Sequence, residues 1–303
     1  MSAAAYHVRQ PILTRPFVTL CFGGFTLLVS FMLLLAVLPL YVKDERGAGD
    51  GIVGLVIGVF ALAALFPRPF IGREIDRTGG KRFLLAGAAI FALSSLLYIV
   101  ATSIPLLLAV RMLHGIGMAC FHTAAFTMVA DLAPAARRAE AMGIWGMMST
   151  FAIASAPYLG LLIHDGPGNR AVFLTSTALA LLALGIMSTV RQPAREAPAA
   201  THSAARSGLI EPAVFVPAIL VLSFTLVYGA VQSFVLIYAE ERAIANAGLY
   251  FSAFAGATLL ARLFGGRLAD RHGRWAIILP SLGLTVLAML LLSVTSSLAL
   301  LLL

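Results

Sequence analysis

The sequence predicts an all-α integral membrane protein, built as a helical bundle of nine complete transmembrane helices and the start of a tenth, in two pseudo-symmetric halves of which the second is incomplete. Three observations lead to this fold class. The composition is 60% hydrophobic and only 11% charged, with a mean hydropathy of +0.97, which is far more apolar than soluble proteins are. Long apolar runs recur along the chain. A short basic phrase occurs twice between such runs, and a repeat of this kind indicates two homologous half-bundles.

Each apolar run is long enough to cross a bilayer as a helix, which takes roughly 20 residues. The first run is too long for a signal peptide and no Ala-x-Ala cleavage site follows it closely, so it is predicted to remain as a helix. The predicted spans are residues 17–42, 52–72, 83–102, 105–130, 140–163, 171–190, 213–239, 245–266 and 276–296, and residues 297–303 begin another apolar run.

A polar stretch divides the spans into two groups. Residues 191–212 are rich in Ala, Pro, Arg and Ser, a composition typical of a flexible linker. We therefore expect an N-terminal six-helix half at residues 1–190, a cytoplasmic linker at 191–212, and an incomplete C-terminal half at 213–303.

The distribution of Lys and Arg predicts the topology. With the amino terminus in the cytoplasm, sixteen of the 21 cations lie on the cytoplasmic side, four lie outside, and Arg111 falls within a span. This bias follows the positive-inside rule and predicts a multi-pass protein of the plasma (inner) membrane. The net charge of +8 is explained by these loop clusters, so we expect the lipid bilayer as a partner and no nucleic acid.

The repeated phrase reads Gly-x-x-x-Asp-Arg-x-Gly. Residues 64–79 match the residues 194 positions later at eight of sixteen places, which indicates an internal duplication. Both copies are predicted to face the cytoplasm, on either side of the linker.

Six spans, a linker and this doubled loop together resemble the major facilitator superfamily of secondary transporters. Arg111 and the glycines Gly115 and Gly117 in the fourth span strengthen the resemblance. Gly143, Pro157 and Gly160 in the fifth span resemble the pattern of drug and sugar efflux branches, although Ala152, Ala156 and Leu161 replace glycines of that pattern. The resemblance implies twelve spans and a cavity lined by spans one, four, seven and ten, so this chain is expected to be C-terminally truncated.

The doubled loop is predicted to form cytoplasmic gating latches. A carboxylate can pair with cations and accept hydrogen bonds from a helix amino terminus, and glycine permits close helix approach. The first copy departs from the family pattern at Gly80, where a basic residue is expected. The alternative is that the cations only fix topology. The latch residues are Gly72, Asp76, Arg77, Gly79, Lys81 and Asp131 for the first copy, with Asp131 accepting from Arg77 or Lys81, and Gly266, Asp270, Arg271, Gly273 and Arg274 for the second.

A polar stripe in the fourth span predicts the substrate and proton pathway. Arg111 and His122 share one helix face, and His114 lies about 60° to one side. An arginine in hydrocarbon marks a functional site or a buried partner, and histidine titrates near physiological pH. The first and seventh spans add Thr26 and Ser30, and Tyr228 and Gln232. The alternative for the small polar residues is helix packing.

Gly143, Pro157 and Gly160 are predicted to bend the fifth span, because glycine and proline weaken helix hydrogen bonding. A bend suits rocking between inward and outward states, and is also common in spans that merely pack tightly.

The sequence therefore predicts a monomeric secondary active transporter that moves a small organic solute by alternating access, coupled to protons as an efflux antiporter. Proton-coupled uptake and a non-transporting scaffold are the alternatives. No Gly-x-Ser-x-Gly, His-Glu-x-x-His or phosphate-binding loop motif occurs, so we expect no enzyme, no catalytic residue, no metal and no cofactor.

Overall fold

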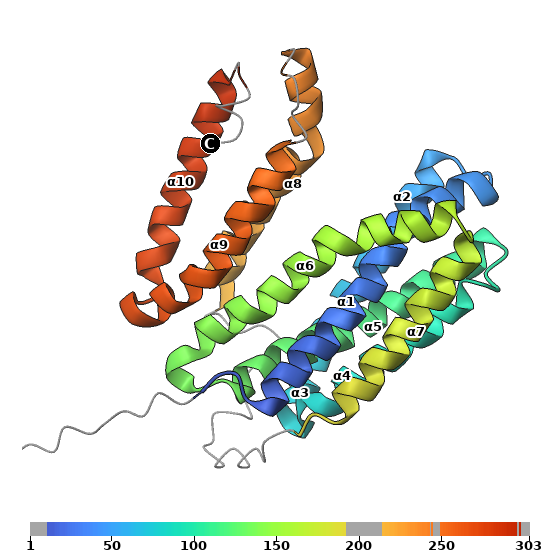
Figure 1. Ribbon diagram of the computed structural model, residues 1–303, viewed down its shortest axis with the longest axis horizontal. Helices are drawn as coiled ribbons and strands as arrows, with labels where there is room; N and C mark the ends of the chain where they lie inside the picture. Colours follow the sequence, from blue (N-terminus) through green and yellow to red (C-terminus); the bar gives the residue numbers. More distant parts are fainter. Residues whose placement is uncertain (1–10, 192–213, 243, 245–248, 296, 298–303) are drawn as a thin grey trace, which may run out of the picture. The chain divides into compact units, whose positions relative to one another are not determined.

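The computed structural model describes residues 11–191, 214–242, 244, 249–295 and 297 (Figure 1). Every regular element in these ranges is helical. The α-helices are α1 (Arg15–Leu40), α2 (Asp50–Leu65), α3 (Arg68–Thr78), α4 (Gly80–Leu97), α5 (Ile104–Leu132), α6 (Arg138–Asp165), α7 (Asn169–Ser188), α8 (Phe215–Glu241), α9 (Leu249–His272) and α10 (Trp275–Val294). A π-helical turn, η1 (Tyr41–Glu45), extends α1, and a 3₁₀ turn, η2 (Ala135–Arg137), precedes α6.

Helices occupy each of the nine predicted spans. Among the described residues, seven helical stretches are long and apolar enough to cross a membrane. The second predicted span consists of α2 and α3 together, separated by a turn at residues 66–67. Membrane crossing by α8 and α9, and hence the count of nine complete spans plus a tenth, stays a prediction.

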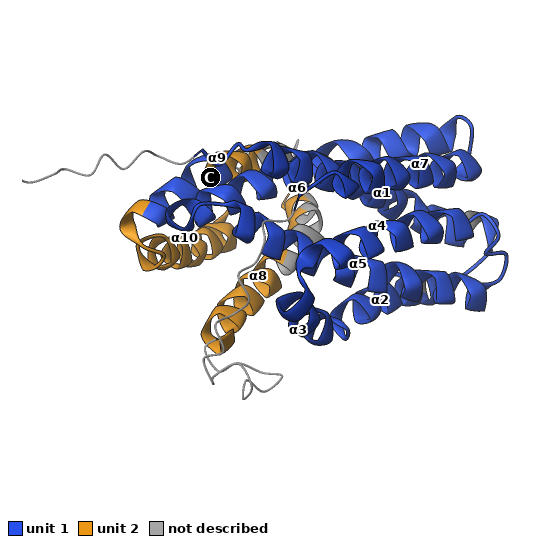
Figure 2. Ribbon diagram, turned by 90° about the horizontal axis from the view of Figure 1, so that it is seen from below, with its two compact units in different colours: residues 1–194, 262–270 blue, residues 195–261, 271–303 orange. Residues whose placement is uncertain are grey.

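The chain forms two compact units, each shown in its own colour in Figure 2. Unit 1 comprises residues 1–194 and also residues 262–270 of α9, whereas unit 2 comprises residues 195–261 and 271–303. The predicted linker lies outside the described residues, apart from Arg191. The division into two halves around this linker stays a prediction.

Close helix packing gives unit 1 its core. Helix α5 packs against α2 and α4, α1 packs against α6 and α7, and α4 packs against α7. Glycines permit this approach: a Cβ added at Gly87 would lie 2.6 Å from the backbone nitrogen of Phe121, and one at Gly115 would lie 2.5 Å from the carbonyl oxygen of Phe60.

Unit 2 has little buried core. Its described buried cluster contains Val235, Ala239 and Ile244, and α10 has no buried residue. Tyr238 of α8 donates a hydrogen bond to the carbonyl oxygen of Leu292 in α10. The apolar side chains of unit 2 are therefore mostly exposed within the described residues.

The last glycine of each repeated phrase ends a helix in the same way. Gly79 follows α3 with φ = +91°, and Gly273 follows α9 with φ = +84°. Glycine adopts such positive φ without the steric cost that other residues meet. The duplication seen in the sequence thus extends to the local backbone.

Candidate functional site

The first candidate site lies around two buried polar residues of α5. Arg111 and His114 are both fully buried. The helix is held between α2 and α4 by contacts of its glycines with neighbouring backbone and side chains, so its polar side chains reach those helices rather than lipid. Burial of a guanidinium inside a membrane bundle is costly and calls for specific contacts.

Contacts from α2 and from the residue that follows α4 surround Arg111. Its Nε donates to the carbonyl oxygen of Val56 in α2 at 3.1 Å, and its guanidinium carbon lies 4.6 Å from the ring centre of Phe60. One terminal nitrogen reaches the hydroxyl of Tyr98, which directly follows α4, at 3.5 Å, and that hydroxyl lies 3.1 Å from Nδ1 of His114. Tyr98 therefore connects the two predicted residues.

This network leaves two buried polar atoms without a hydrogen-bond partner among the described residues. They are the second terminal nitrogen of Arg111 and Nε2 of His114. The His114 ring is otherwise enclosed by the rings of Phe31, Phe60 and Phe91. Within the described ranges, Arg111 forms no ion pair with a carboxylate. An unpartnered donor in an apolar setting attracts an anion or a proton-accepting group.

The other predicted pathway residues lie apart from this network. His122 contacts Phe121 and Phe126 of its own helix. Thr26 donates to the carbonyl oxygen of Phe22 at 2.9 Å. Ser30 is fully buried and bonds to Ser176, whose hydroxyl also lies 3.0 Å from that of Ser95. The serine contacts join α1, α4 and α7, as expected of polar helix packing.

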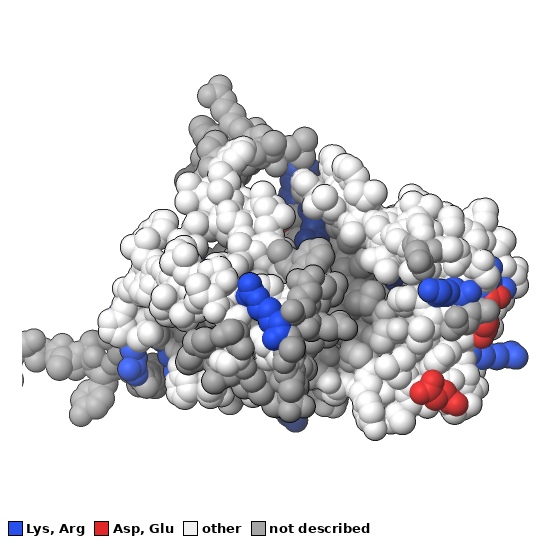
Figure 3. Space-filling view, turned by 90° about the horizontal axis from the view of Figure 1, so that it is seen from above, with Lys and Arg blue, Asp and Glu red and all other residues white. Residues whose placement is uncertain are grey.

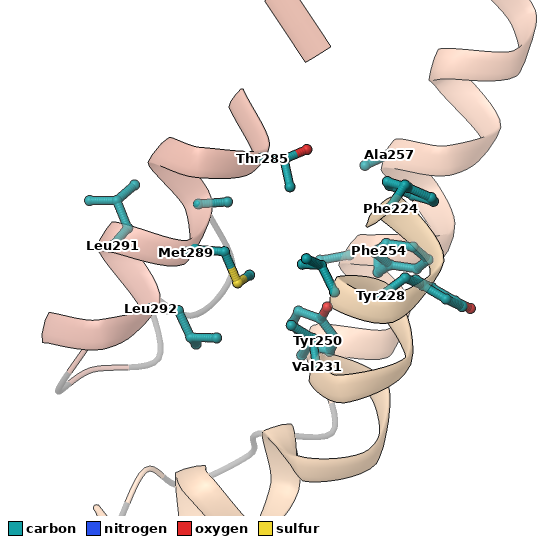
Figure 4. A pocket seen from close by; sticks show the side chains of 13 residues that line it. Phe224, Tyr228, Val231, Tyr250, Phe254, Ala257, Thr285, Met289, Leu291 and Leu292 are labelled. Carbon is teal, nitrogen blue, oxygen red and sulfur yellow. The ribbon is translucent and has the colours of Figure 1, made fainter. Parts of the chain in front are cut away.

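Tyr228 of the seventh predicted span lines a cavity in unit 2. The cavity has a volume of about 250 Å³ and is formed by residues of α8, α9 and α10. Figure 4 shows Phe224, Tyr228 and Phe254 on one side and Met289 and Leu292 on the other. The side chain of Gln232 lies outside the described residues.

The second candidate site is the amino terminus of α6, which holds the carboxylate of Asp270. The backbone N–H of Ala139 donates to Oδ1 at 3.2 Å, and that of Glu140 donates to Oδ2 at 2.9 Å. Helix α6 has no side-chain cap of its own from Arg137. Since the first N–H groups of a helix lack intrahelical partners and carry partial positive charge, a carboxylate stabilises them.

Glu140 adds ion pairs to this contact. Its two oxygens accept from Nε of Arg267 at 2.7 Å and from Arg137 at 2.8 Å. The Glu140 side chain is 10% exposed, whereas that of Arg267 is 62% exposed. We call Asp270, Glu140, Arg137, Arg267 and the first turn of α6 the α6 contact.

Glycines allow the backbones to meet here. A Cβ at Gly266 would lie 2.6 Å from the carbonyl oxygen of Ala139, and one at Gly143 would lie 2.7 Å from that of Arg262. A Cβ added at Gly160 would likewise lie 2.7 Å from the carbonyl oxygen of Leu33 in α1. Gly143 and Gly160 thus act as packing positions, while α6 continues through Pro157. The bend at Pro157 stays a prediction.

The remaining latch residues lie at helix ends. Arg271 is in the last turn of α9, Gly273 follows that helix, and Arg274 precedes α10. In the first copy, Asp76 and Arg77 are exposed and Gly79 is buried. Lys81 lies in the first turn of α4, and Asp131 near the end of α5. Acceptance by Asp131 from Arg77 or Lys81 stays a prediction.

Sequence reasoning missed Tyr98 and Glu140. Glu140 follows Arg137 at i+3, a spacing that favours an ion pair on a helix, so a signal existed. Ser94, Ser95 and Tyr98 lie together within the third predicted span, which marks a polar patch but does not identify its partners.

Comparison with known proteins places the chain in a family. The sequence pattern of the Major Facilitator Superfamily matches residues 20–303. The chain belongs to this superfamily. Its members are multi-pass membrane transporters of small molecules and not enzymes.

Individual relatives and structures agree with this assignment. The chain is 30% identical over 167 residues to Multidrug resistance protein 2 of Bacillus subtilis, covering 55% of this chain and 41% of that protein. It is 30% identical over 275 residues to an uncharacterized MFS-type transporter of Pseudomonas aeruginosa, covering 85% and 65%. The chain thus spans less than two thirds of the length of these relatives.

Two solved structures share the fold. The transporter FucP, in its outward conformation, matches with a TM-score of 0.71 and 19% identity, covering 86% of this chain and 72% of that one. The human organic anion transporter MFSD10 matches with a TM-score of 0.70 and 20% identity, covering 96% and 81%. At these identities, the likeness establishes the fold alone.

Proposed function

We propose that this chain is a secondary active transporter that exports a small organic solute by alternating access in exchange for protons. Relatives named as multidrug and quinolone resistance proteins support export of an organic molecule. In this proposal the protein acts as a monomer in the plasma (inner) membrane with a cytoplasmic amino terminus, as the distribution of its cations favours.

The observation that carries the proposal is the buried Arg111–Tyr98–His114 network. Nδ1 of His114 is engaged by Tyr98, so Nε2 is the atom available to accept and release a proton. The unpartnered nitrogen of Arg111 supplies a fixed positive charge beside it, which attracts an anionic group. His122 and the residues Thr26, Ser30, Tyr228 and Gln232 remain proposed pathway positions.

The α6 contact supplies the gating step of this proposal. Asp270 holds the first turn of α6 in one state and releases it in another, so the helix is free to move when the cap is lost. Motion of α6 reaches the bundle because Gly160 packs on Leu33 of α1. Asp76 would perform the same task in the first copy, with a different partner.

The aromatic cavity of unit 2 favours an apolar or aromatic solute. The ring centre of Tyr228 lies 6.1 Å from that of Phe224 and 5.5 Å from that of Phe254. Aromatic rings bind flat organic molecules through their faces and edges.

Proteoliposomes with an acid interior test the proposal, with ethidium as the fluorescent probe. Proton exchange predicts ethidium accumulation that stops when the pH gradient is collapsed. Arg111→Gln should slow ethidium accumulation at least about tenfold, or about 1.4 kcal/mol in activation free energy, because the network around His114 loses its guanidinium. Arg82→Gln, which removes an exposed cation outside both candidate sites, should leave the rate unchanged.

Other outcomes separate the alternatives. Ethidium leaving together with protons would indicate symport and hence uptake. Ethidium flux that is unaffected by the pH gradient, or by Arg111→Gln, would contradict the proton-exchange mechanism. No flux with any gradient would favour a non-transporting protein.

A further inference from the structure

A polar hollow lies at the opposite end of α6 from the α6 contact. It has a volume of about 400 Å³ and is lined by Tyr41, Glu45, Arg46, Asn169, Arg170 and Phe173, with Ile99 beside them. These residues come from η1, from the turn after α4 and from the start of α7, all within unit 1. None of them belongs to the pathway or latch residues above.

The position of the hollow matches the headgroup depth of a bilayer. Helix α6 has 28 residues, so at 1.5 Å per residue its ends are about 42 Å apart. A bilayer including its headgroups is about 40–45 Å thick. In Figure 3 the acidic side chains in view lie at one end of the face, with basic side chains beside them. The hollow therefore lies at the membrane surface away from the basic repeated loops.

Two guanidinium groups line this hollow, and neither pairs with a carboxylate of the described residues. Nε of Arg46 donates to the hydroxyl of Tyr41 at 3.1 Å, and its guanidinium lies 4.9 Å from the centre of that ring. Arg170 is exposed and makes no hydrogen bond or ion pair to any described residue. Arginines of this kind retain several N–H groups that suit phosphate oxygens.

Glu45, the acidic residue that lines the hollow, already accepts a hydrogen bond. Glu45 accepts a hydrogen bond from the Nδ2 amide of Asn169, whose Oδ1 lies 2.9 Å from Nδ1 of His164. Asn169 is 8% exposed and Tyr41 is 2% exposed. The hollow thus has a rigid polar wall, and its two arginines outnumber its single carboxylate.

Apolar surface borders the hollow. Val100 directly follows Ile99 and is 58% exposed, and Leu174 directly follows Phe173 and is 47% exposed. Val100 lies in the turn after α4 and Leu174 in α7, and these two helices pack against each other. A ligand with a phosphate in the hollow and hydrocarbon along these helices would satisfy both kinds of surface.

From this arrangement we infer that the hollow binds a phosphate-type oxyanion through Arg46 and Arg170. The bordering leucine and valine favour the headgroup of an anionic phospholipid as its source over free phosphate. This site would fix the ends of α1 and α7 together at the membrane surface, and it does not depend on transport or its direction.

Native mass spectrometry of the full chain in detergent tests the proposal. Phosphatidylglycerol, diacylglycerol of the same acyl chains and inorganic phosphate serve as three separate probes. We expect retention of phosphatidylglycerol and not of diacylglycerol. Arg170→Gln should weaken retention about tenfold and Arg46→Gln/Arg170→Gln further. Lys43→Gln, which removes a cation of η1 that does not line the hollow, should have no effect.

The phosphate arm identifies the source of the oxyanion. If millimolar phosphate binds and Arg170→Gln abolishes it, the oxyanion site is supported with a soluble ligand. Equal retention of diacylglycerol, or binding of both phosphate probes that Arg170→Gln leaves unchanged, would overturn the proposal. Because Arg170 is exposed and bonded to no described residue, its replacement should leave folding intact, which an unchanged melting temperature would verify.

Discussion

The two copies of the repeated phrase share a sequence but differ in what they contact. In the second copy, Asp270 accepts two N–H groups from the first turn of α6, and Gly266 lies against backbone. In the first copy, Asp76 is exposed, and a Cβ added at Gly72 would meet only Thr123, at 4.0 Å. The helix-ending glycines nevertheless have nearly equal φ angles.

This difference shows that the phrase determines its own helix end, while elements elsewhere in the chain determine what its glycine and its aspartate contact. The two units also differ in the helices that are available for packing. In unit 1, α1, α2 and α4 pack on α5, α6 and α7. By the 194-residue repeat, α8, α9 and α10 correspond to α1, α2 with α3, and α4, and the described residues of unit 2 contain no counterparts of α5–α7.

The largest effect should come from Gly266→Leu. Its Cβ would lie 2.6 Å from a backbone oxygen of α6, so the helix segment must move away and break the α6 contact as a whole. Overpacking of this kind costs about 1–3 kcal/mol, which a lower melting temperature in detergent would report. Gly72→Leu is the matched control and should change it little. Equal effects of the two substitutions would remove the contrast between the copies.

A smaller effect is expected from Glu140→Gln. The glutamine side chain has no negative charge, so the ion pairs with Arg137 and Arg267 are lost. The effect is modest because Arg267 is mostly exposed to solvent. A double-mutant cycle with Arg267→Gln should give a coupling of about 0.5–1 kcal/mol in the free energy of unfolding. Zero coupling would mean that the Arg267–Glu140 pair contributes nothing to the contact.

How much of this could be predicted from the sequence depends on the range of the interaction. The predicted spans end at residues 72 and 266, whereas α3 and α9 continue to Thr78 and His272. The left-handed glycines that follow these helices, Gly79 and Gly273, are a local feature of the repeated phrase. The repeat singled out Asp270 as a carboxylate suited to a helix amino terminus. It did not identify α6 as the partner, since Ala139 and Asp270 are 131 positions apart.

The buried site shows the same limit. Periodicity placed Arg111, His114 and His122 in one polar stripe, with Arg111 and His122 on the same face. Arg111 and His114 are fully buried and share a network, whereas His122 lies apart from it. The link through Tyr98 required the packing of α4 on α5, which depends on Gly87 and Gly117 meeting side chains and backbone of the opposite helix. Likewise, Gly143 and Gly160 were assigned to a bend, although their missing side chains make room for Arg262 and Leu33.

The smallest effect is that of salt. Screening shortens the range of surface charges to about 3 Å at 1 M ionic strength. The melting temperature should therefore fall slightly more with added NaCl in the wild-type chain than in Glu140→Gln/Arg267→Gln, by an amount worth a few tenths of a kcal/mol. If the melting temperatures of the wild type and the double variant change equally with salt, the ion pairs of Glu140 do not stabilise the α6 contact.

Amide hydrogen exchange at Ala139 and Glu140 tests the central claim most directly, because these are the N–H groups that Asp270 accepts. Loss of a helix cap costs about 1–2 kcal/mol, so Asp270→Ala should accelerate exchange at the start of α6 about 5- to 30-fold. Asp76→Ala should leave it unchanged. Equal exchange in the wild type and in Asp270→Ala would contradict the account.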